Sequence, residues 1–155
     1  MAVVSNSSPL IALARIQRLD LLPAIFEAVL IPPAVAREIA PSIPVLPTWL
    51  RIHAPSVPPS APLLRRRLGA GEREALALAI ELGADWIILD DLPARRSAED
   101  SDLNVIGTLG TFLAAKHAGL IKAIRPELDA LLRTSFFLSP QLYDELLRAA
   151  GEIDS

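Results

Sequence analysis

Cysteine is absent from the 155 residues of this chain, which excludes disulfide bridges, thiolate metal sites and cysteine nucleophiles. An apolar run of about 18 residues is also missing, so we expect no membrane-spanning helix and no membrane partner. The N-terminal residues lack the basic segment of a secretory signal, and we therefore expect a cytoplasmic protein. Because the net charge is −3, binding of nucleic acid would need a local basic patch or a metal ion.

Hydrophobic residues make up 52% of the chain, which allows a sizeable core. Short apolar runs predict strands at residues 2–4, 28–31, 50–53, 86–89 and 104–106. Helices are predicted from Pro9 to Ala14, at 19–26, 34–40, 71–82, 92–100 and 108–118, and as a pair within 126–150. The rest of the proline-rich stretch 41–62 is predicted to be ordered loop. Alternating strands and helices indicate a parallel sheet covered on both faces, and we expect one α/β domain over residues 1–155.

Two adjacent carboxylates follow one of the predicted strands. Asp90 and Asp91 come directly after the strand at 86–89, and sites in open parallel sheets form beyond the carboxyl ends of the strands. Capping the next helix needs only one of the two carboxylates. The pair therefore indicates either a helix cap with a first-turn acid or part of a functional site.

Another carboxylate lies on the apolar side of a predicted helix. On a helical wheel of residues 71–82, four residues form the solvent face: Arg73, Glu74, Ala77 and Glu81. Glu72 points the other way, and a carboxylate there is costly unless it is paired or binds a cation. Because Glu72 lies near the helix start, a capping role is the alternative to a role in a site.

Three consecutive arginines, Arg65, Arg66 and Arg67, precede a glycine-containing turn. They form either a solvated loop or phosphate contacts beside an acidic site. The turn itself, Gly69-Ala70-Gly71, lacks the third glycine of a dinucleotide-binding loop. A small Rossmann-type ligand binder is therefore the least favoured interpretation.

Four segments in this order resemble those of PIN-domain proteins: VVSNSSPLIALARI, VLIPPAVAREI, GAGEREALALAIELGADWIILDDLPAR and NVIGTLGTFLAAKHAGLI. The resemblance is to the prokaryotic branch related to the nuclease toxins of toxin–antitoxin pairs. It implies a three-layer α/β/α fold around a central parallel sheet. It also implies cleavage of RNA with Mg²⁺ or Mn²⁺, and an antitoxin protein as a partner.

The resemblance also implies site residues. The acidic positions of the family map onto five residues of this chain: Asn6, Glu38, Glu72, Asp90 and Asp91. The last two share one position, since the register is ambiguous by one residue. Asn6, Glu72 and one or both aspartates are the expected metal ligands, and Glu38 completes the catalytic set directly or through water. Small hydroxyl residues near the first acid correspond to Ser7 and Ser8, which we expect to contact RNA together with the three arginines.

Asn6 departs from the family pattern, which has an aspartate that binds the metal directly. An asparagine offers a neutral oxygen, so the site loses one negative charge and the affinity for a hard cation should fall. Two functions follow as hypotheses. The chain is either a metal-dependent ribonuclease or a PIN-like module with a weakened site that binds RNA or a protein without cleavage.

The apolar composition is high for one small domain, and part of the excess is expected at a homodimer interface. The candidates for this interface lie near the C-terminus: Phe136, Phe137, Leu142, Tyr143, Leu146 and Leu147. A place in the core explains these residues equally well.

Overall fold

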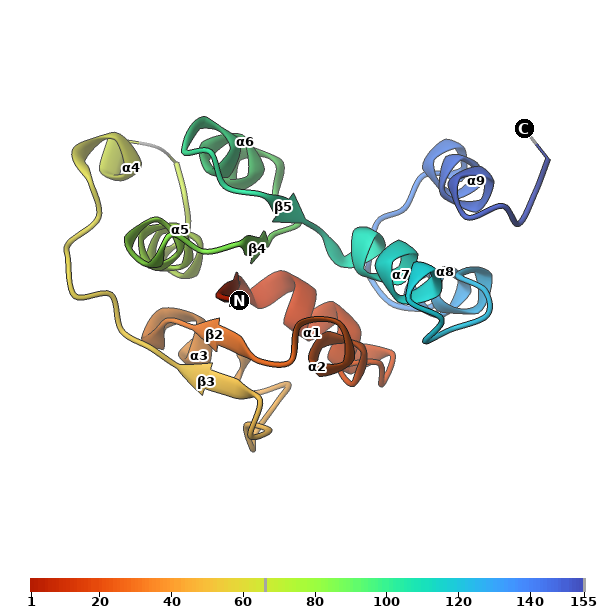
Figure 1. Ribbon diagram of the computed structural model, residues 1–155, viewed down its shortest axis with the longest axis horizontal. Coiled ribbons are helices and arrows are strands. Elements are labelled where there is room, and N and C mark those ends of the chain that lie inside the picture. Colours follow the sequence, from red (N-terminus) through yellow and green to blue (C-terminus); the bar gives the residue numbers. More distant parts are fainter. Residues whose placement is uncertain (66, 155) are drawn as a thin grey trace.

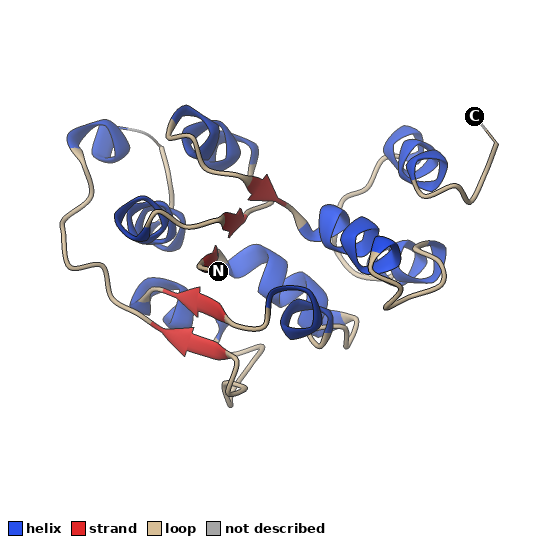
Figure 2. Cartoon of the chain, viewed as in Figure 1, coloured by secondary structure: helices blue, strands red, loops and turns tan. Residues whose placement is uncertain are grey.

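A parallel sheet lies at the centre of the protein (Figures 1 and 2). The computed structural model describes residues 1–65 and 67–154. The strands are β1 (Val3–Ser5), β2 (Val29–Ile31), β3 (Leu50–Ile52), β4 (Trp86–Ile88) and β5 (Val105–Ile106), in the order β3-β2-β1-β4-β5. Every neighbouring pair is parallel, so the carboxyl ends of all strands lie at the same edge of the sheet.

Helices flank this sheet and complete the expected three-layer α/β/α fold, which is confirmed. They are α1 (Ser7–Arg15), α2 (Leu21–Phe26), α3 (Pro33–Ile39), α4 (Ala61–Arg65), α5 (Ala70–Leu82), α6 (Leu92–Asp100), α7 (Thr108–His117), α8 (Arg125–Leu132) and α9 (Pro140–Ala149). Several helix ends follow from local sequence signals. The Asp91 side chain caps α6, and Gly83 ends α5 in the left-handed conformation with φ of 57°. The predicted strands and helices are all present, with their ends shifted by a few residues.

The hydrophobic core is one cluster that extends from the sheet to the C-terminal helices. Val4 and Ile87 lie fully buried in the two central strands, and Phe112 is fully buried on α7. Leu131 of α8 and Leu147 of α9 join the same cluster. The C-terminal helices are therefore packed onto the α/β core by apolar side chains.

Most of the stretch 41–62 is loop outside β3, as predicted, and a helix that was not predicted, α4, begins at its end. This helix tolerates Pro62 because a proline is accommodated in a first helical turn. One prediction for α5 was wrong. Ala77 of α5 was expected to face solvent but is only 8% exposed. The preceding segment, residues 57–60, and Leu63 of α4 lie beside Ala77 and cover that side of α5. A wheel of one helix cannot show what another segment will cover.

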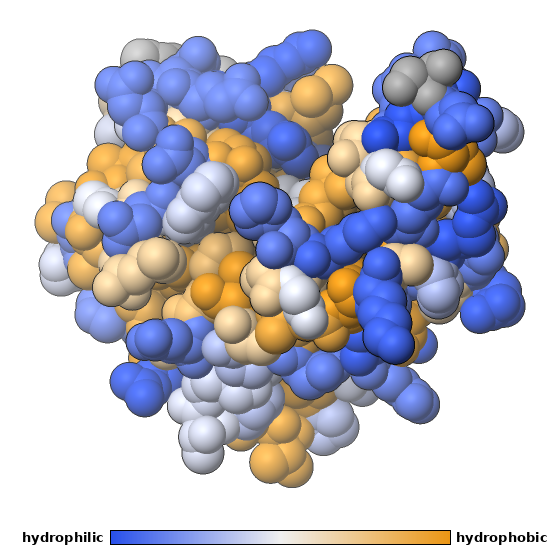
Figure 3. Space-filling model, turned by 45° about the vertical axis from the view of Figure 1, so that its right-hand side comes forward, coloured by the Kyte–Doolittle hydropathy of each residue, from blue (hydrophilic) through white to orange (hydrophobic). Residues whose placement is uncertain are grey.

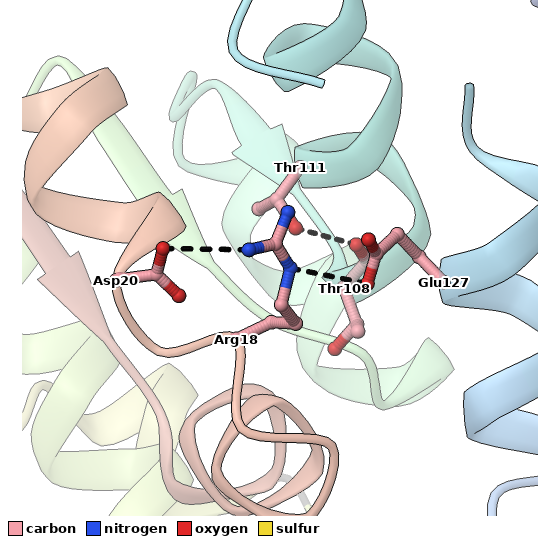
Figure 4. Close-up of polar contacts among 5 residues, drawn as sticks. All are labelled: Arg18, Asp20, Thr108, Thr111 and Glu127. Carbon is pink, nitrogen blue, oxygen red and sulfur yellow. Dashed lines mark hydrogen bonds and ion pairs between the residues drawn. The ribbon is translucent and has the colours of Figure 1, made fainter. Parts of the chain in front are cut away.

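An arginine ties the N-terminal half to α8 (Figure 4). Arg18, between α1 and α2, donates from Nε to Glu127 on α8 at 3.2 Å and from Nη1 to Asp20 at 3.5 Å. In the same view, Thr111 Oγ1 donates to the backbone oxygen of Thr108 at 2.6 Å in the first turn of α7. The Arg18–Glu127 contact holds α8 beside the segment that connects α1 to α2.

The candidate dimer residues divide between core and surface. Leu147 is buried, and Phe136, Tyr143 and Leu146 pack partly buried against the core. Phe137 is 87% exposed and Leu142 is 38% exposed. Figure 3 shows hydrophobic and hydrophilic residues mixed over the surface, with a notch between α9 and the rest of the molecule. Part of the apolar excess is thus explained by the core, and homodimerisation stays a prediction.

Within residues 1–65 and 67–154, no helix has the length and apolar character needed to cross a membrane.

Candidate metal centre

A polar pocket of about 270 Å³ opens where the central strands end. Its lining residues come from four separate parts of the chain: Asn6, Ser7, Ser8, Ile11, Glu38, Gly69, Glu72 and Asp91. We call it the carboxylate pocket. Four of the residues expected at a metal site therefore lie together, although up to 85 positions separate them in the sequence, from Asn6 to Asp91.

Asn6 is placed in this pocket by the pairing of the two central strands. Ser5 of β1 is paired with Ile88 of β4, and the backbone N–H of Asn6 donates to the Ile88 oxygen at 3.0 Å. Asn6 is only 3% exposed, and its side-chain amide has no hydrogen-bond partner among the described residues. Its amide oxygen is therefore free to bind a ligand in the pocket.

Glu72 divides its two carboxylate oxygens between two roles. Oε1 accepts a hydrogen bond from the backbone N–H of Gly69 at 3.1 Å and so caps α5. Oε2 is buried and has no partner within the described part of the chain. A buried carboxylate oxygen without a donor is costly, and a bound cation would offset that cost. The capping role and the site role are thus compatible in one side chain.

Burial raises the pKa of Glu72 above its ordinary value. The hydrogen bond from Gly69 acts in the opposite direction, but the neighbouring carboxylates of Asp91 and Glu38 raise the pKa further. The Glu72 carboxyl group is therefore harder to ionise in this pocket, which is the condition that a divalent cation relieves.

Glu38 reaches the pocket from α3, although its side chain is exposed. The hydroxyl of Ser7 donates a short hydrogen bond to Glu38 Oε1. The carboxylate lies so close to Gly71 that a Cβ there would overlap Oε1 and come within 2.9 Å of Cδ. Gly71 is thus required for the position of Glu38. The sequence signal for this close approach is a glycine in the first turn of a helix, at Gly71.

The two adjacent aspartates point in different directions. Asp91 lines the carboxylate pocket, while its Oδ2 caps α6 by accepting from the Ala94 N–H at 3.1 Å. Asp90 accepts from the Thr108 N–H at 2.8 Å and from the Thr108 hydroxyl at 2.6 Å. Asp90 lines another pocket, with residues of α1 and the loop after α8, which shares Ser8 and Ile11 with the carboxylate pocket. The structure therefore brings Asp91, and not Asp90, to the other carboxylates.

The donor set of the carboxylate pocket suits a hard divalent cation. Glu38, Glu72 and Asp91 supply carboxylate oxygens and Asn6 supplies a neutral one, which are the ligands that Mg²⁺ and Mn²⁺ prefer. Within residues 1–65 and 67–154, no three histidine or acidic side chains are spaced as in a formed metal site. The residues fit a cation by chemistry and location, and binding would require the side chains to close around it.

Only some of the residues expected to contact RNA line the carboxylate pocket. Ser7 and Ser8 both line the carboxylate pocket. Arg67 is exposed in the turn before Gly69, and Arg65 is the last residue of α4. Arg66 lies outside the described residues.

Comparisons with known proteins agree with this architecture. A comparison with curated protein sequences found no match. Among solved structures, the chain is similar to SSO1118, a PilT N-terminus domain protein from the hyperthermophilic archaeon Sulfolobus solfataricus P2, with a TM-score of 0.53. The two share 20% sequence identity over 72% of this chain and 90% of that one, a similarity that shows the fold alone.

A sequence comparison with family models gives a more extensive match. The model described as "DUF3368: PIN domain" matches residues 2–152, which is nearly the whole chain. The chain therefore belongs to this PIN-domain family.

Proposed function

We propose that this protein is a metal-dependent ribonuclease that hydrolyses phosphodiester bonds of RNA at the carboxylate pocket. One observation carries the proposal: Oε2 of Glu72 is buried without a partner in a pocket that also holds Glu38, Asp91 and Asn6. PIN-domain proteins are typically nucleases and generally use divalent metal ions. The oxygen-rich lining of this pocket supports the same chemistry here.

Each residue would have a distinct task in this reaction. A bound Mg²⁺ or Mn²⁺ supplies Lewis acidity at the phosphate and lowers the pKa of the attacking water. Glu72 and Asp91 would hold the ion, and both are already oriented by hydrogen bonds to the starts of α5 and α6. Asn6 would contribute its amide oxygen, and Ser7 would hold the Glu38 carboxylate at the rim.

A second function is supported by two specific observations. Asn6 provides no negative charge, and the described residues hold no preformed group of three ligands. Both observations favour weak metal binding. The alternative is a PIN-like module that binds RNA or a protein partner without cleaving RNA.

Cleavage of a single-stranded RNA oligonucleotide in Mn²⁺ and in EDTA tests the two functions. We expect the wild type to cleave in Mn²⁺ only, and Glu72→Gln to abolish cleavage because it removes a charged ligand without changing the side-chain shape. Glu145→Gln, an exposed acid on α9, is the matched control and should retain activity. If Asn6→Asp cleaves RNA and the wild type does not, the binding module is the correct function.

The biological setting is proposed on the resemblance alone. We expect expression of an active chain to arrest growth and an antitoxin protein to relieve the arrest. Glu72→Gln should abolish the arrest if RNA cleavage causes it. Normal growth with an active wild-type enzyme would argue against the toxin role.

We also expect a homodimer that uses the exposed apolar side chain of Phe137. Light scattering at micromolar concentration would give twice the mass of the chain, and Phe137→Ser would give a monomer. A monomeric wild type at that concentration would contradict this expectation.

A further inference from the structure

A second and larger pocket is lined by α3 and α5, the helices that also carry Glu38 and Glu72 to the carboxylate pocket. It has a volume of about 650 Å³ and lies between the start of α3, the start of α5 and the proline-rich segment 54–59. We call it the arginine pocket, because it is lined by the side chains of Arg37 and Arg73. The fourteen prolines of the chain are partly concentrated here, and Pro33, Pro55 and others form its apolar wall.

On both α3 and α5, two consecutive residues line different pockets. Glu38 lines the carboxylate pocket and Arg37 lines the arginine pocket. On the neighbouring helix, Glu72 and Arg73 are divided between the pockets in the same way. Consecutive residues of a helix point about 100° apart, so the same two helices present their arginines to one pocket and their glutamates to the other.

The guanidinium groups in the arginine pocket have few hydrogen-bond acceptors among the described residues. Arg73 donates from Nη2 to the backbone oxygen of Leu68 at 3.2 Å, but its buried Nε has no acceptor in the described part of the chain. Arg37 is exposed and has no ion pair or hydrogen bond there either. Among the described lining residues, Glu74 is the one carboxylate, and it already accepts from the Ala34 N–H at 3.2 Å. The described lining thus has two guanidinium groups to one carboxylate, which leaves N–H donors for an anionic ligand.

The wall opposite these arginines is held in place by a hydrogen-bonded acid. Glu81 of α5 accepts from the backbone N–H groups of Ser56 and Val57, at 2.9 and 2.8 Å from Oε1. Proline also restricts the backbone of this segment. The pocket is therefore an ordered feature of the fold and not a gap beside a loose loop.

We propose that the arginine pocket binds a phosphate of the same RNA strand whose neighbouring phosphodiester reaches the carboxylate pocket. This inference rests on the proposed function. A strand that approaches three carboxylates on a protein of net charge −3 needs compensating cations nearby. Arginine forms directed hydrogen bonds to phosphate oxygens, and the proline wall offers an apolar surface to a sugar or base.

Binding of a fluorescent single-stranded RNA in EDTA, followed by anisotropy at several salt concentrations, tests this proposal without cleavage. We expect Arg37→Ala to weaken binding roughly threefold to tenfold at low salt and to reduce the slope of log K against log salt by about 0.7, the value for one lost phosphate contact. Arg73→Gln should act similarly. The control Arg148→Ala removes an exposed arginine of α9 that lines neither pocket and should leave the slope unchanged.

The outcomes separate the arginine pocket from the proposed nuclease. Suppose that Glu72→Gln abolishes Mn²⁺-dependent cleavage but Arg37→Ala leaves the slope of log K against log salt at the wild-type value. The proposal of a phosphate site is then wrong, while the proposed nuclease function is supported. If no protein cleaves RNA but the arginine variants still lose slope, the phosphate site stands alone. If an oligoglutamate peptide binds through Arg37 while RNA does not, the pocket takes an acidic protein partner instead. Arg37 is exposed, so its variant remains interpretable even if Arg73→Gln unfolds.

Discussion

The carboxylate of Glu38 lies against the backbone of Gly71, where a side chain would overlap it. The three atoms nearest to the added Cβ would be Oε1, Cδ and Oε2 of Glu38, which are the far end of a flexible side chain. The Glu38 side chain can therefore move away at little cost to the fold. What would be lost is its position in the carboxylate pocket and its hydrogen bond from Ser7.

Gly71→Ala should therefore separate stability from metal binding. Alanine within α5 should leave the free energy of unfolding unchanged or raise it by up to about 1 kcal/mol, because glycine is the poorer helix former. The increase in melting temperature caused by Mn²⁺ should fall. In the double variant with Glu38→Gln the two losses should not add, since both act on one carboxylate. A full Mn²⁺ response in Gly71→Ala would show that Glu38 does not contribute to the site.

The effect of Asn6→Asp on the melting temperature should differ between chelator and Mn²⁺. In chelator the new charge repels Glu72 and Asp91, so the variant should melt lower than the wild type, by roughly 2–4 °C for each kcal/mol lost. In Mn²⁺ it should gain more than the wild type, because the ion binds only the folded state and prefers carboxylate ligands.

Asp91→Asn should behave in the opposite way. Asparagine keeps the cap on α6, so the substitution removes a charge without removing the hydrogen bond. The variant should melt higher in chelator and gain less from Mn²⁺. Asp144→Asn on α9 is the control for loss of an exposed aspartate. Equal responses of all these proteins to Mn²⁺ would mean that Asn6 and Asp91 do not share a metal site.

Asp90 should matter for stability and not for metal. Asp90→Ala leaves the N–H and the hydroxyl of fully buried Thr108 without their acceptor, which should cost roughly 2–4 kcal/mol. Chemical denaturation would measure this loss. The difference between melting temperatures with and without Mn²⁺ should match that of the wild type, in contrast to Asp91→Asn. A reduced Mn²⁺ response in Asp90→Ala would place Asp90 at the site instead.

Stability at acidic pH should depend on Glu152, which connects the C-terminus to the start of α8. It accepts from the Ile124 N–H at 2.7 Å, from Lys116 Nζ at 3.0 Å and from the Arg125 N–H at 3.2 Å. Burial alone would raise the pKa of Glu152, but these partners outweigh it and the pKa lies below the ordinary value of 4.5.

A carboxyl group whose pKa is lowered by folding stabilises the protein fully above the unfolded pKa and ceases to do so as pH falls through the folded one. Glu152→Gln should therefore be less stable than the wild type at neutral pH, by about 1–2 kcal/mol. The difference should shrink as pH falls below the unfolded value of 4.5. Urea denaturation at several pH values would measure it, and a difference that does not change with pH would contradict this assignment.

Local sequence signals were sufficient to predict the strands, the helices and the α/β class of the fold. Strands such as β4 and helices such as α5 and α6 follow from apolar periodicity, caps and prolines, which act over a few neighbouring residues. Asp90 and Asp91 were candidates because they follow a predicted strand, and Glu72 because it lies on the apolar side of a predicted helix. The place of Asn6 beside them was implied by the resemblance. Glu38 was included only through the resemblance to PIN domains, since an exposed glutamate on α3 carries no local signal.

Tertiary structure alone decided which of two adjacent aspartates faces the other carboxylates. Asp90 and Asp91 are adjacent, so their neighbours in the sequence do not show which of them faces the pocket. That depends on Thr108 of α7, which donates two hydrogen bonds to Asp90. The burial of Ala77 beside α4 and the arginine pocket between α3 and α5 likewise have no signal in the local sequence. Such features depend on contacts between segments that lie far apart in the chain, and local periodicity carries no information about which segments will meet.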